Sequence, residues 1–493
     1  MLAIHIEDIK IASHDLGEIC RIVSFVFLIP IVVTLYYAKH YDPFFLAERI
    51  SVFAIPALLL YLLYLIFKRI KVDTHAKTKH VMITVALAWL LIALVGSLPY
   101  LLSNTLNPLD SFFESMSGLT TTGMTMIEYP EDLLDDKRDV LFYRSLTQWI
   151  GGVGIIMLAM IVFLRKGTAA IEYYSSEVGN LKIRPSIRST IIETWKIYSL
   201  YTLACAILLF LAGMTVFDAI NHSLTTLPTG GFSTHSESIG HFHKPVIELV
   251  IIIFMLVGGI SFILHFRAFE GKPSHLFQNI EFRYMLMFLV IGFVICSYEL
   301  YISDPGWGDF QISLFQMVSI MTTTGFGTAD ISEWTFLSKT ILLILMFIGG
   351  SYGSTGSGVK VLRAVTILKT IVHSIKKAML PKTAVVRLKL GDKSIHYDEI
   401  IYVISFLTAY LVITLIGILV FNALGYGGYE SISVSLSAIS NVGPTYLSWD
   451  AWFSIPDIGK ITLILLMWVG RLEVFPILIL FASIVYKKKS RKI

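Results

Sequence analysis

The chain has 493 residues, of which 55% are hydrophobic and only 15% are charged, and its net charge is +4. Soluble domains carry about a quarter charged residues, so this composition excludes an ordinary water-soluble protein. Uncharged apolar stretches such as 81–102 and 401–421 are long enough to cross a membrane, because a helix needs roughly 20 residues to span about 30 Å of hydrocarbon. Cys20, Cys205 and Cys296 are scattered along the chain, which predicts neither a disulfide framework nor a metal site.

The charged residues are segregated between alternate connections. Acidic residues gather in 128–139 and 304–309, whereas basic residues gather in 68–79, 165–196, 267–283, 360–393 and 487–492. Positively charged loops remain in the cytoplasm, so both termini and the basic connections are predicted to lie there. The first 20 residues lack the apolar core of a cleavable signal. These features predict a multi-pass protein of the lipid bilayer.

In chain order, the apolar stretches predict ten membrane-crossing helices. A first pair is followed by four more pairs, at 22–38 and 51–67, 81–102 and 141–164, 198–217 and 246–264, 284–301 and 338–370, and 399–422 and 458–486. Within each of the last four pairs lies a shorter polar segment, at 110–125, 218–234, 309–328 and 430–445. Each segment begins with an acid and ends in a turn of small residues around Gly123, Gly230, Gly325 or Gly443.

Four similar units at roughly even spacing indicate an internal repeat. We therefore expect an all-α polytopic membrane protein with four pore repeats, each made of an outer helix, a half-helix, an extended loop and an inner helix. Two further transmembrane helices precede these repeats. The corresponding division of the chain is 1–75 for the N-terminal pair and 76–190, 191–275, 276–395 and 396–493 for the repeats.

The four polar segments have the properties of a cation filter. Irregular backbone at membrane depth is tolerated only where protein buries it or where it lines an aqueous cavity. Rings of backbone carbonyls replace the hydration shell of potassium, glycine gives access to the required dihedral angles, and the C-terminal ends of the half-helices favour a cation. The alternative is a set of extracellular turns rich in Gly and Thr, but four such loops in register favour the filter.

Several stretches resemble the Trk/Ktr/HKT superfamily of potassium transporters, specifically its TrkH-type membrane subunits. They are TTTGMT at 120–125, PTGGFST at 228–234, TTTGFGT at 322–328, NVGP at 441–444, QWIGGVGI at 148–155, GGSYGSTGSGVKV at 349–361 and GRLEVF at 470–475. The resemblance covers nearly the whole chain, including the extra helical pair at its start.

The resemblance implies four M1–P–M2 repeats with pseudo-fourfold symmetry around a pore, in a homodimer of the bacterial cytoplasmic (inner) membrane. It implies potassium as the transported ion, with rubidium accepted and sodium disfavoured. The filter residues that it implies are Thr121, Thr122, Gly123, Pro228, Thr229, Gly230, Thr323, Thr324, Gly325, Asn441, Val442 and Gly443. The fourth loop departs from the Thr-x-Gly pattern, which puts the role of its side chains in doubt but leaves its carbonyls available.

The third inner helix is interrupted at 349–358, where Gly349, Gly350, Gly353, Gly356 and Gly358 fall close together. Each glycine in a helix costs about 1 kcal/mol relative to alanine, so this run predicts a break. The resemblance implies an intramembrane gate under the filter, and a plain kink is the alternative.

Arg471 lies inside an apolar helix, where a bare cation facing lipid is costly. We expect it to face the pore and to bond the 349–358 loop, with an ion pair to another helix as the alternative. Glu473 is two residues away, on a different helical face, and is therefore a poor direct partner.

Other polar and small residues carry weaker expectations. Asp110, Glu114, Asp218 and His222 are predicted to lie near the outer pore mouth, where acids concentrate cations. Small residues in membrane helices more often permit close packing than hinge motion, so packing is the expected role of the glycines at 151, 152 and 154.

The chain has no nucleotide-binding fingerprint and no nucleic-acid motif, so no cofactor is expected in it. The resemblance implies a TrkA-type cytoplasmic ring that binds nucleotides. The basic stretches 360–393, which includes Lys376 and Lys377, and 165–188 are its expected docking surfaces, although anionic lipid headgroups attract the same charges.

Two other functions remain as alternatives. A symporter that couples potassium to protons or sodium also uses repeats and broken helices, and the sequence leaves channel and symporter both open. An enzyme is not expected, because the chain lacks a paired Asp, a Ser–His dyad or an H-x-x-x-H arrangement on one membrane helix.

Overall fold

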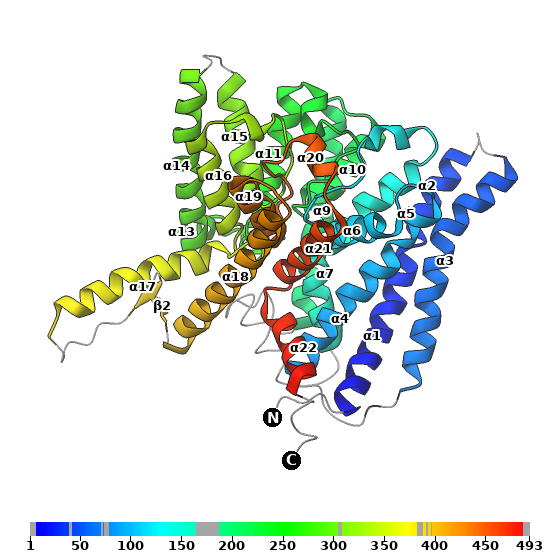
Figure 1. Cartoon of the computed structure of the whole chain (residues 1–493), viewed down its shortest axis with the longest axis horizontal. Helices are drawn as coiled ribbons and strands as arrows, with labels where there is room; N and C mark the ends of the chain where they lie inside the picture. Colours follow the sequence, from blue (N-terminus) through cyan, green and yellow to red (C-terminus); the bar gives the residue numbers. More distant parts are fainter. Residues whose placement is uncertain are drawn as a thin grey trace.

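The computed structural model describes residues 6–38, 42–70, 72, 78–163, 187–303, 308–381, 388–390, 393–395 and 397–486. Most residues of this part of the chain are helical (Figure 1). Its two strands, β1 (Lys389–Leu390) and β2 (Lys393–Ser394), form a small antiparallel hairpin in which Lys389 lies opposite Ser394. The fold is thus all-α, as predicted.

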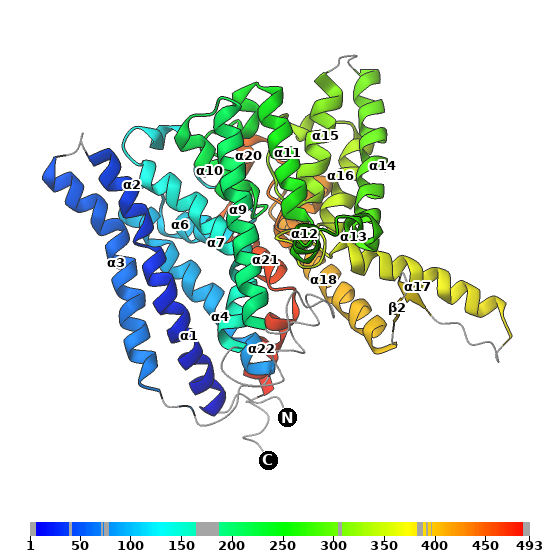
Figure 2. The ribbon, with the colours of Figure 1, turned by 180° about the vertical axis from the view of Figure 1, so that it is seen from behind.

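An N-terminal helical group lies on one side of the molecule, as Figures 1 and 2 show from opposite faces. It consists of α1 (Ile6–Val26), α2 (Ile29–Tyr37) and α3 (Pro43–Lys68). The carboxylate of Asp42 caps α3 by accepting a bond from the Phe45 amide at 2.8 Å, and a proline follows at the first helical position. Buried Arg49 of α3 forms an ion pair with Asp139, which attaches this group to the first pore repeat.

The four pore repeats follow in chain order. The first contains α4 (Thr78–Gly96), α5 (Leu98–Leu102), α6 (Pro108–Leu119), η2 (Pro130–Leu134) and α7 (Arg138–Phe163), and the second contains α9 (Ile187–Leu211), α10 (Val216–Thr226), η3 (Ser238–Phe242), α11 (Pro245–Gly259) and α12 (Phe262–Phe269). After α13 (Ser274–Gln278), the third contains α14 (Ile280–Ser303), α15 (Gly308–Met321), η4 (Ile331–Glu333), α16 (Phe336–Ile348) and α17 (Val361–Met379). The fourth contains α18 (Tyr397–Ala423), α19 (Gly428–Ser440), α20 (Trp449–Phe453), α21 (Asp457–Arg471) and α22 (Phe475–Tyr486).

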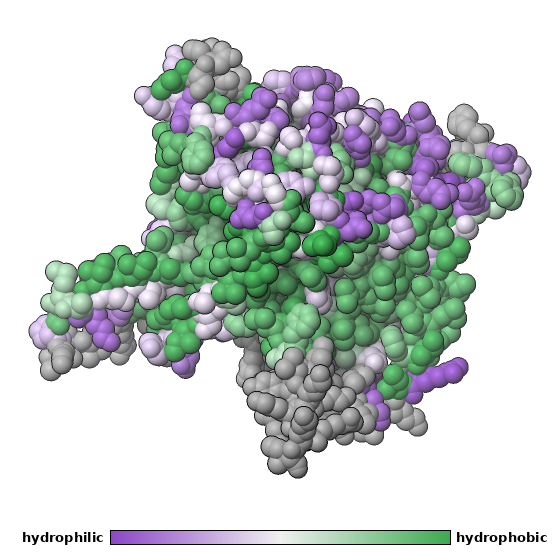
Figure 3. Space-filling model, viewed as in Figure 1, coloured by the Kyte–Doolittle hydropathy of each residue, from purple (hydrophilic) through white to green (hydrophobic). Residues whose placement is uncertain are grey.

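Six of the described helical segments are long and apolar enough to cross a membrane, and counting two bent helix pairs as one span each gives up to eight. The six correspond to the predicted helices at 22–38, 51–67, 81–102, 198–217, 284–301 and 399–422. Apolar residues form a band across the middle of the molecule, with polar residues gathered above it (Figure 3). The first described helix begins and the last one ends at the same end of the molecule, as an even number of crossings requires (Figure 1).

Three of the four inner helices are broken, whereas the sequence predicted a break only in the third. The second turns by 102° between α11 and α12, and the fourth turns by 110° between α21 and α22. In the fourth, Glu473 and Val474 adopt positive φ angles of 55° and 65°, which a continuous helix does not allow. The predicted continuous helices 246–264 and 458–486 are therefore wrong in this respect. The first inner helix, α7, continues over 26 residues.

Candidate functional site

The four loops that follow the short helices α6, α10, α15 and α19 share one backbone conformation. In each, a residue with φ between 53° and 61° is followed two positions later by a glycine with φ between 80° and 111°. The amide between them donates to the carbonyl five residues earlier, at 2.8–3.0 Å. In loop order, the three positions are Thr121–Thr122–Gly123, Thr229–Gly230–Gly231, Thr323–Thr324–Gly325 and Asn441–Val442–Gly443.

This geometry corrects the register predicted for the second loop. The glycine with positive φ is Gly231, at 80°, and not Gly230. Gly230 instead occupies the middle position, where its amide donates to the carbonyl of Thr225 at 2.9 Å. The set Pro228, Thr229 and Gly230 is therefore shifted by one residue relative to the other three loops.

The four loops contact one another in a closed ring. An added Cβ would lie 2.3 Å from the Gly230 oxygen if placed on Gly123, and 2.7 Å from the Thr122 oxygen if placed on Gly443. A Cβ added to Gly231 would lie 2.1 Å from the oxygen of Thr324, and a Cβ added to Gly325 would lie 1.9 Å from the oxygen of Val442. Real Cβ atoms do not approach oxygen this closely, so glycine is required at all four positions. Each loop thus packs its glycine against the middle carbonyl of the next, in the order first, second, third, fourth and first again.

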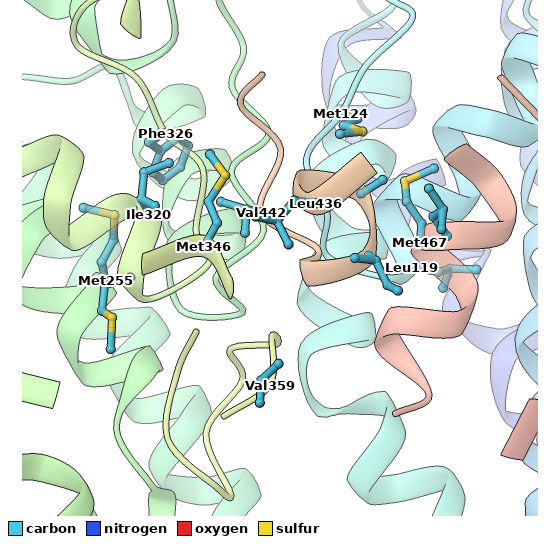
Figure 4. Close-up of a cluster of buried hydrophobic side chains, with 14 of the residues drawn as sticks. Leu119, Met124, Met255, Ile320, Phe326, Met346, Val359, Leu436, Val442 and Met467 are labelled. Atoms are coloured by element: carbon cyan, nitrogen blue, oxygen red, sulfur yellow. The ribbon is translucent and has the colours of Figure 1, made fainter. Parts of the chain in front are cut away.

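Side chains behind the ring hold these loops in place. The hydroxyls of Thr120 and Thr122 lie 2.7 Å apart, and those of Thr322 and Thr324 lie at the same distance. Asn441 takes the place of the first threonine in the fourth loop, and its amide donates to the Thr122 hydroxyl and to the Met467 carbonyl, both at 2.9 Å. Buried apolar side chains surround the loops, with Val442 near the centre of the cluster (Figure 4).

Gln148 is a structural residue that the sequence analysis did not single out. It projects from α7, where its amide donates to the Gly230 carbonyl at 2.6 Å and accepts from the Phe232 amide at 3.1 Å. It is completely buried. A glutamine within a predicted membrane-crossing helix was the available signal, because a buried amide needs partners.

The acids predicted at the outer pore mouth are bound within the protein. Glu114 is fully buried and accepts a bond from Arg144 at 2.6 Å, and Asp110 accepts one from Lys460 at 2.5 Å. Asp218 accepts a bond from Thr234 at 2.7 Å. Each of these carboxylates is thus engaged in an ion pair or a hydrogen bond that shapes a loop, and their effect on cations at the pore mouth stays a prediction.

Hydrogen bonds to a carboxylate also join the connection after the second loop to η2. Glu131 accepts bonds from the amide and hydroxyl of Ser236 at 2.8 and 2.6 Å. Partial burial acts to raise the pKa of Glu131, but these bonds outweigh it and keep the pKa below its ordinary value. The rings of His235 and His241 stack at 3.7 Å, and partial burial together with the charge of His235 lowers the pKa of His241.

The glycine-rich segment 349–360 forms a loop beneath the second and third loops of the ring. The amide of Ser357 donates to the hydroxyl of Thr323 at 2.8 Å, and the hydroxyl of Thr355 donates to the Leu227 carbonyl at 2.8 Å. An added Cβ on Gly356 would lie 2.9 Å from the oxygen of Thr322. Val359, on this segment, belongs to the same buried cluster as Val442 and lies below it in Figure 4. The break in the third inner helix therefore places a loop directly against the candidate filter.

Arg471 joins this loop to the first inner helix. One guanidinium nitrogen donates to the Thr355 carbonyl and to the Ser357 hydroxyl, both at 2.9 Å, and another donates to the Gly151 carbonyl at 2.8 Å. Arg471 is buried. The contact with the loop is the one that the sequence analysis expected, whereas its effect on conduction stays a prediction.

A second set of buried charges lies where the loop meets α17. Arg363 of α17 pairs with Glu473 at 2.5 Å, and Lys360 donates to the carbonyl of Gly356 at 2.5 Å. The amide of Tyr352 donates to the carboxylate of Glu281 at 3.1 Å. Glu473 therefore forms an ion pair with Arg363 of α17.

The fold and this arrangement define a class of protein: a polytopic membrane protein with four quasi-equivalent re-entrant loops around a pseudo-fourfold axis. A family profile described as TrkH, cation transport protein, matches residues 54–493. The chain belongs to this TrkH family of cation transport proteins, and it is a transport protein, not an enzyme.

Individual relatives are similar to this chain over most of their lengths. An uncharacterised cation transporter of Methanocaldococcus jannaschii is 37% identical over 98% of this chain and 97% of its own length. The Trk system potassium uptake protein TrkH of Escherichia coli is 36% identical over 84% of this chain and 87% of its own. The crystal structure of the potassium transporter TrkH from Vibrio parahaemolyticus matches with a TM-score of 0.84 at 32% identity, covering 96% of this chain and 98% of that one.

Proposed function

We propose that this chain takes up potassium ions through a selectivity filter made of its four re-entrant loops. The closed ring of glycine-to-carbonyl contacts carries the proposal, because it brings four extended backbone segments together around one axis. Carbonyl rings of this kind replace the hydration shell of a potassium ion. Relatives named as potassium uptake proteins support the choice of ion. Rubidium is expected to pass and sodium to pass less readily.

The glycine-rich segment 349–360 is the proposed gate. It lies against Thr323 and Leu227 at the base of the second and third loops, and Arg471 holds it to α7. Breaking these contacts is expected to favour conduction, because they hold the loop against the base of the proposed filter.

The proposal also covers the membrane and the partners of the chain. We propose that the chain lies in a bacterial cytoplasmic membrane with both termini inside, as one subunit of a homodimer. Amphipathic α17 projects from the body of the molecule (Figures 1 and 2) and exposes Lys376 and Lys377 near its end. We infer that these lysines contribute to docking a TrkA-type nucleotide-binding ring. Neutralising both should reduce capture of the ring, and undiminished capture would contradict docking there.

Cation flux into proteoliposomes tests the filter. The wild-type protein is expected to carry potassium and rubidium down their own gradients, and Gly123→Ser is expected to weaken discrimination against sodium, because its side chain meets the Gly230 carbonyl. Gly428→Ser is the matched control, since a Cβ there meets nothing within 4 Å. Flux that requires an imposed proton or sodium gradient would overturn the channel-like mechanism in favour of symport.

A further inference from the structure

An apolar cavity of about 150 Å³ lies between the N-terminal helical group and the first pore repeat. It is lined by residues from α1, including Ile19, Val23 and Val26, together with Trp89 of α4, Leu119 of α6 and Trp149 of α7. An engineered apolar cavity of similar size in another protein stays dry and takes up benzene or xenon. The size therefore suits a short piece of hydrocarbon.

The surface that lines the cavity is apolar. The hydroxyl of Tyr143 donates to the Gly96 carbonyl at 2.8 Å, that of Thr147 donates to the Arg144 carbonyl at 2.7 Å, and the indole nitrogen of Trp149 donates to the hydroxyl of Thr202 at 3.1 Å. These lining residues therefore direct their polar atoms into bonds within the protein. Among the described residues, the indole nitrogens of Trp89 and Trp195 have no hydrogen-bond partner, so a polar group placed in the cavity would find at most these two donors in exchange for its hydrogen bonds to water.

The cavity reaches the part of the surface that faces lipid. Two lining residues, Ile22 and Ile29, are 36% and 41% exposed, and they lie on the membrane-crossing segment Lys10–Tyr37. The medium at this depth is the hydrocarbon of lipid tails. The available occupant is therefore an acyl chain, which is apolar, flexible and present at high concentration at the opening.

The inner wall of the cavity belongs to the candidate filter and gate. Leu119 is the last residue of α6, directly before the first loop of the ring. Gly151 also lines the cavity; its carbonyl accepts the bond from Arg471, and a Cβ on it would lie 2.2 Å from the Leu119 oxygen. A group that fills the cavity thus presses on the same backbone that positions both the first loop and the Arg471 contact.

We propose that this cavity binds one acyl chain of a membrane lipid, and that its occupancy supports the backbone at Leu119 and Gly151 and so tunes ion flux. The first half of this proposal is independent of the transported ion, whereas the second half rests on the function proposed above. Binding and flux are therefore measured separately.

Binding is tested by tryptophan fluorescence in bilayers of phosphatidylcholine with brominated or unmodified acyl chains. Bromine quenches indoles that it contacts, and the cavity is lined by Trp89, Trp149 and Trp195 among the eight tryptophans of the chain. Val23→Phe and Val26→Phe fill the cavity and are each expected to remove part of the quenching. Val32→Phe, at an exposed position on α2 outside the cavity, is the matched control and is expected to retain all of it. Equal quenching in all four proteins overturns the site.

Flux is then measured in the same bilayers. The two filled variants are expected to differ from the wild type by several-fold in potassium flux, while Val32→Phe matches it. Reduced quenching with unchanged flux would overturn the link to the gate. If the wild-type protein conducts no potassium at all while the quenching difference persists, the proposed function fails and the acyl-chain site stands.

Discussion

The first and third inner helices both bring glycines close to the candidate filter, yet the two helices differ in conformation. In α7, Gly151 and Gly152 stay helical, and added Cβ atoms would lie 2.2 Å from the Leu119 oxygen and 2.5 Å from Pro228. In the third repeat, Gly349 and Gly358 have φ angles of 71° and 84° and the chain leaves the helix. Glycine in α7 thus permits close backbone packing, as the sequence analysis expected, whereas glycine in the third repeat permits a left-handed turn.

Arg471 connects these two regions. Its guanidinium donates both to the Gly151 carbonyl of the packed helix and to the Thr355 carbonyl of the loop. The rigid helix therefore serves as the support against which the loop is held. Substitutions in the helix are expected to affect folding, and substitutions in the loop to affect conduction.

The largest expected effect is that of Gly151→Ala. Its methyl group would overlap the Leu119 carbonyl, and overpacking of this kind typically costs about 1–3 kcal/mol or more. We expect a lower melting temperature in detergent and a loss of flux. Gly154→Ala is the control, because its Cβ would meet Trp89 at an ordinary contact distance of 3.4 Å. Equal melting temperatures for the two variants would contradict the packing role.

Arg471→Met is expected to raise potassium flux about tenfold. A hydrogen bond to a charged group is worth about 1.5–3 kcal/mol, and about 1.4 kcal/mol corresponds to a factor of ten. Losing even one of the bonds between Arg471 and the loop therefore shifts a closed–open equilibrium by at least roughly this factor. Flux into proteoliposomes measures the effect. Lys196→Met, which removes an exposed lysine paired with Glu193, is the control and should leave flux unchanged. Unchanged flux in Arg471→Met would contradict the proposed gate.

Gly349→Ala is expected to change flux by a smaller, several-fold factor and to lower the melting temperature. A non-glycine residue with positive φ costs roughly 1–2 kcal/mol, and the new methyl would also meet the Ser357 oxygen at 2.2 Å. Gly425→Ala has the same backbone strain, with φ at 94°, but its Cβ meets nothing within 4 Å. If both variants alter flux equally, strain alone and not the loop contact explains the result.

Much of the fold was predictable from the sequence, because apolar length and repeated polar segments mark membrane helices and re-entrant loops directly. The register of the second loop could not be predicted from the sequence, because Gly230 and Gly231 are adjacent and only the structure shows which of them has a positive φ angle. The break between α21 and α22 was missed because the positive φ angles fall on Glu473 and Val474. Neither residue type is typical of positive φ, so nothing in the sequence indicated a turn there. The ion pair of Glu114 was not predicted because its partner Arg144 lies 30 residues away in the chain.

The most direct test of the account is the position of bound rubidium in a crystal of the protein grown with rubidium in place of potassium. Anomalous scattering locates the ion independently of any flux assay. The account predicts a peak enclosed by the four middle residues, Thr122, Gly230, Thr324 and Val442. Rubidium bound only elsewhere, with no peak within this ring, would contradict the claim that the four loops form an ion filter.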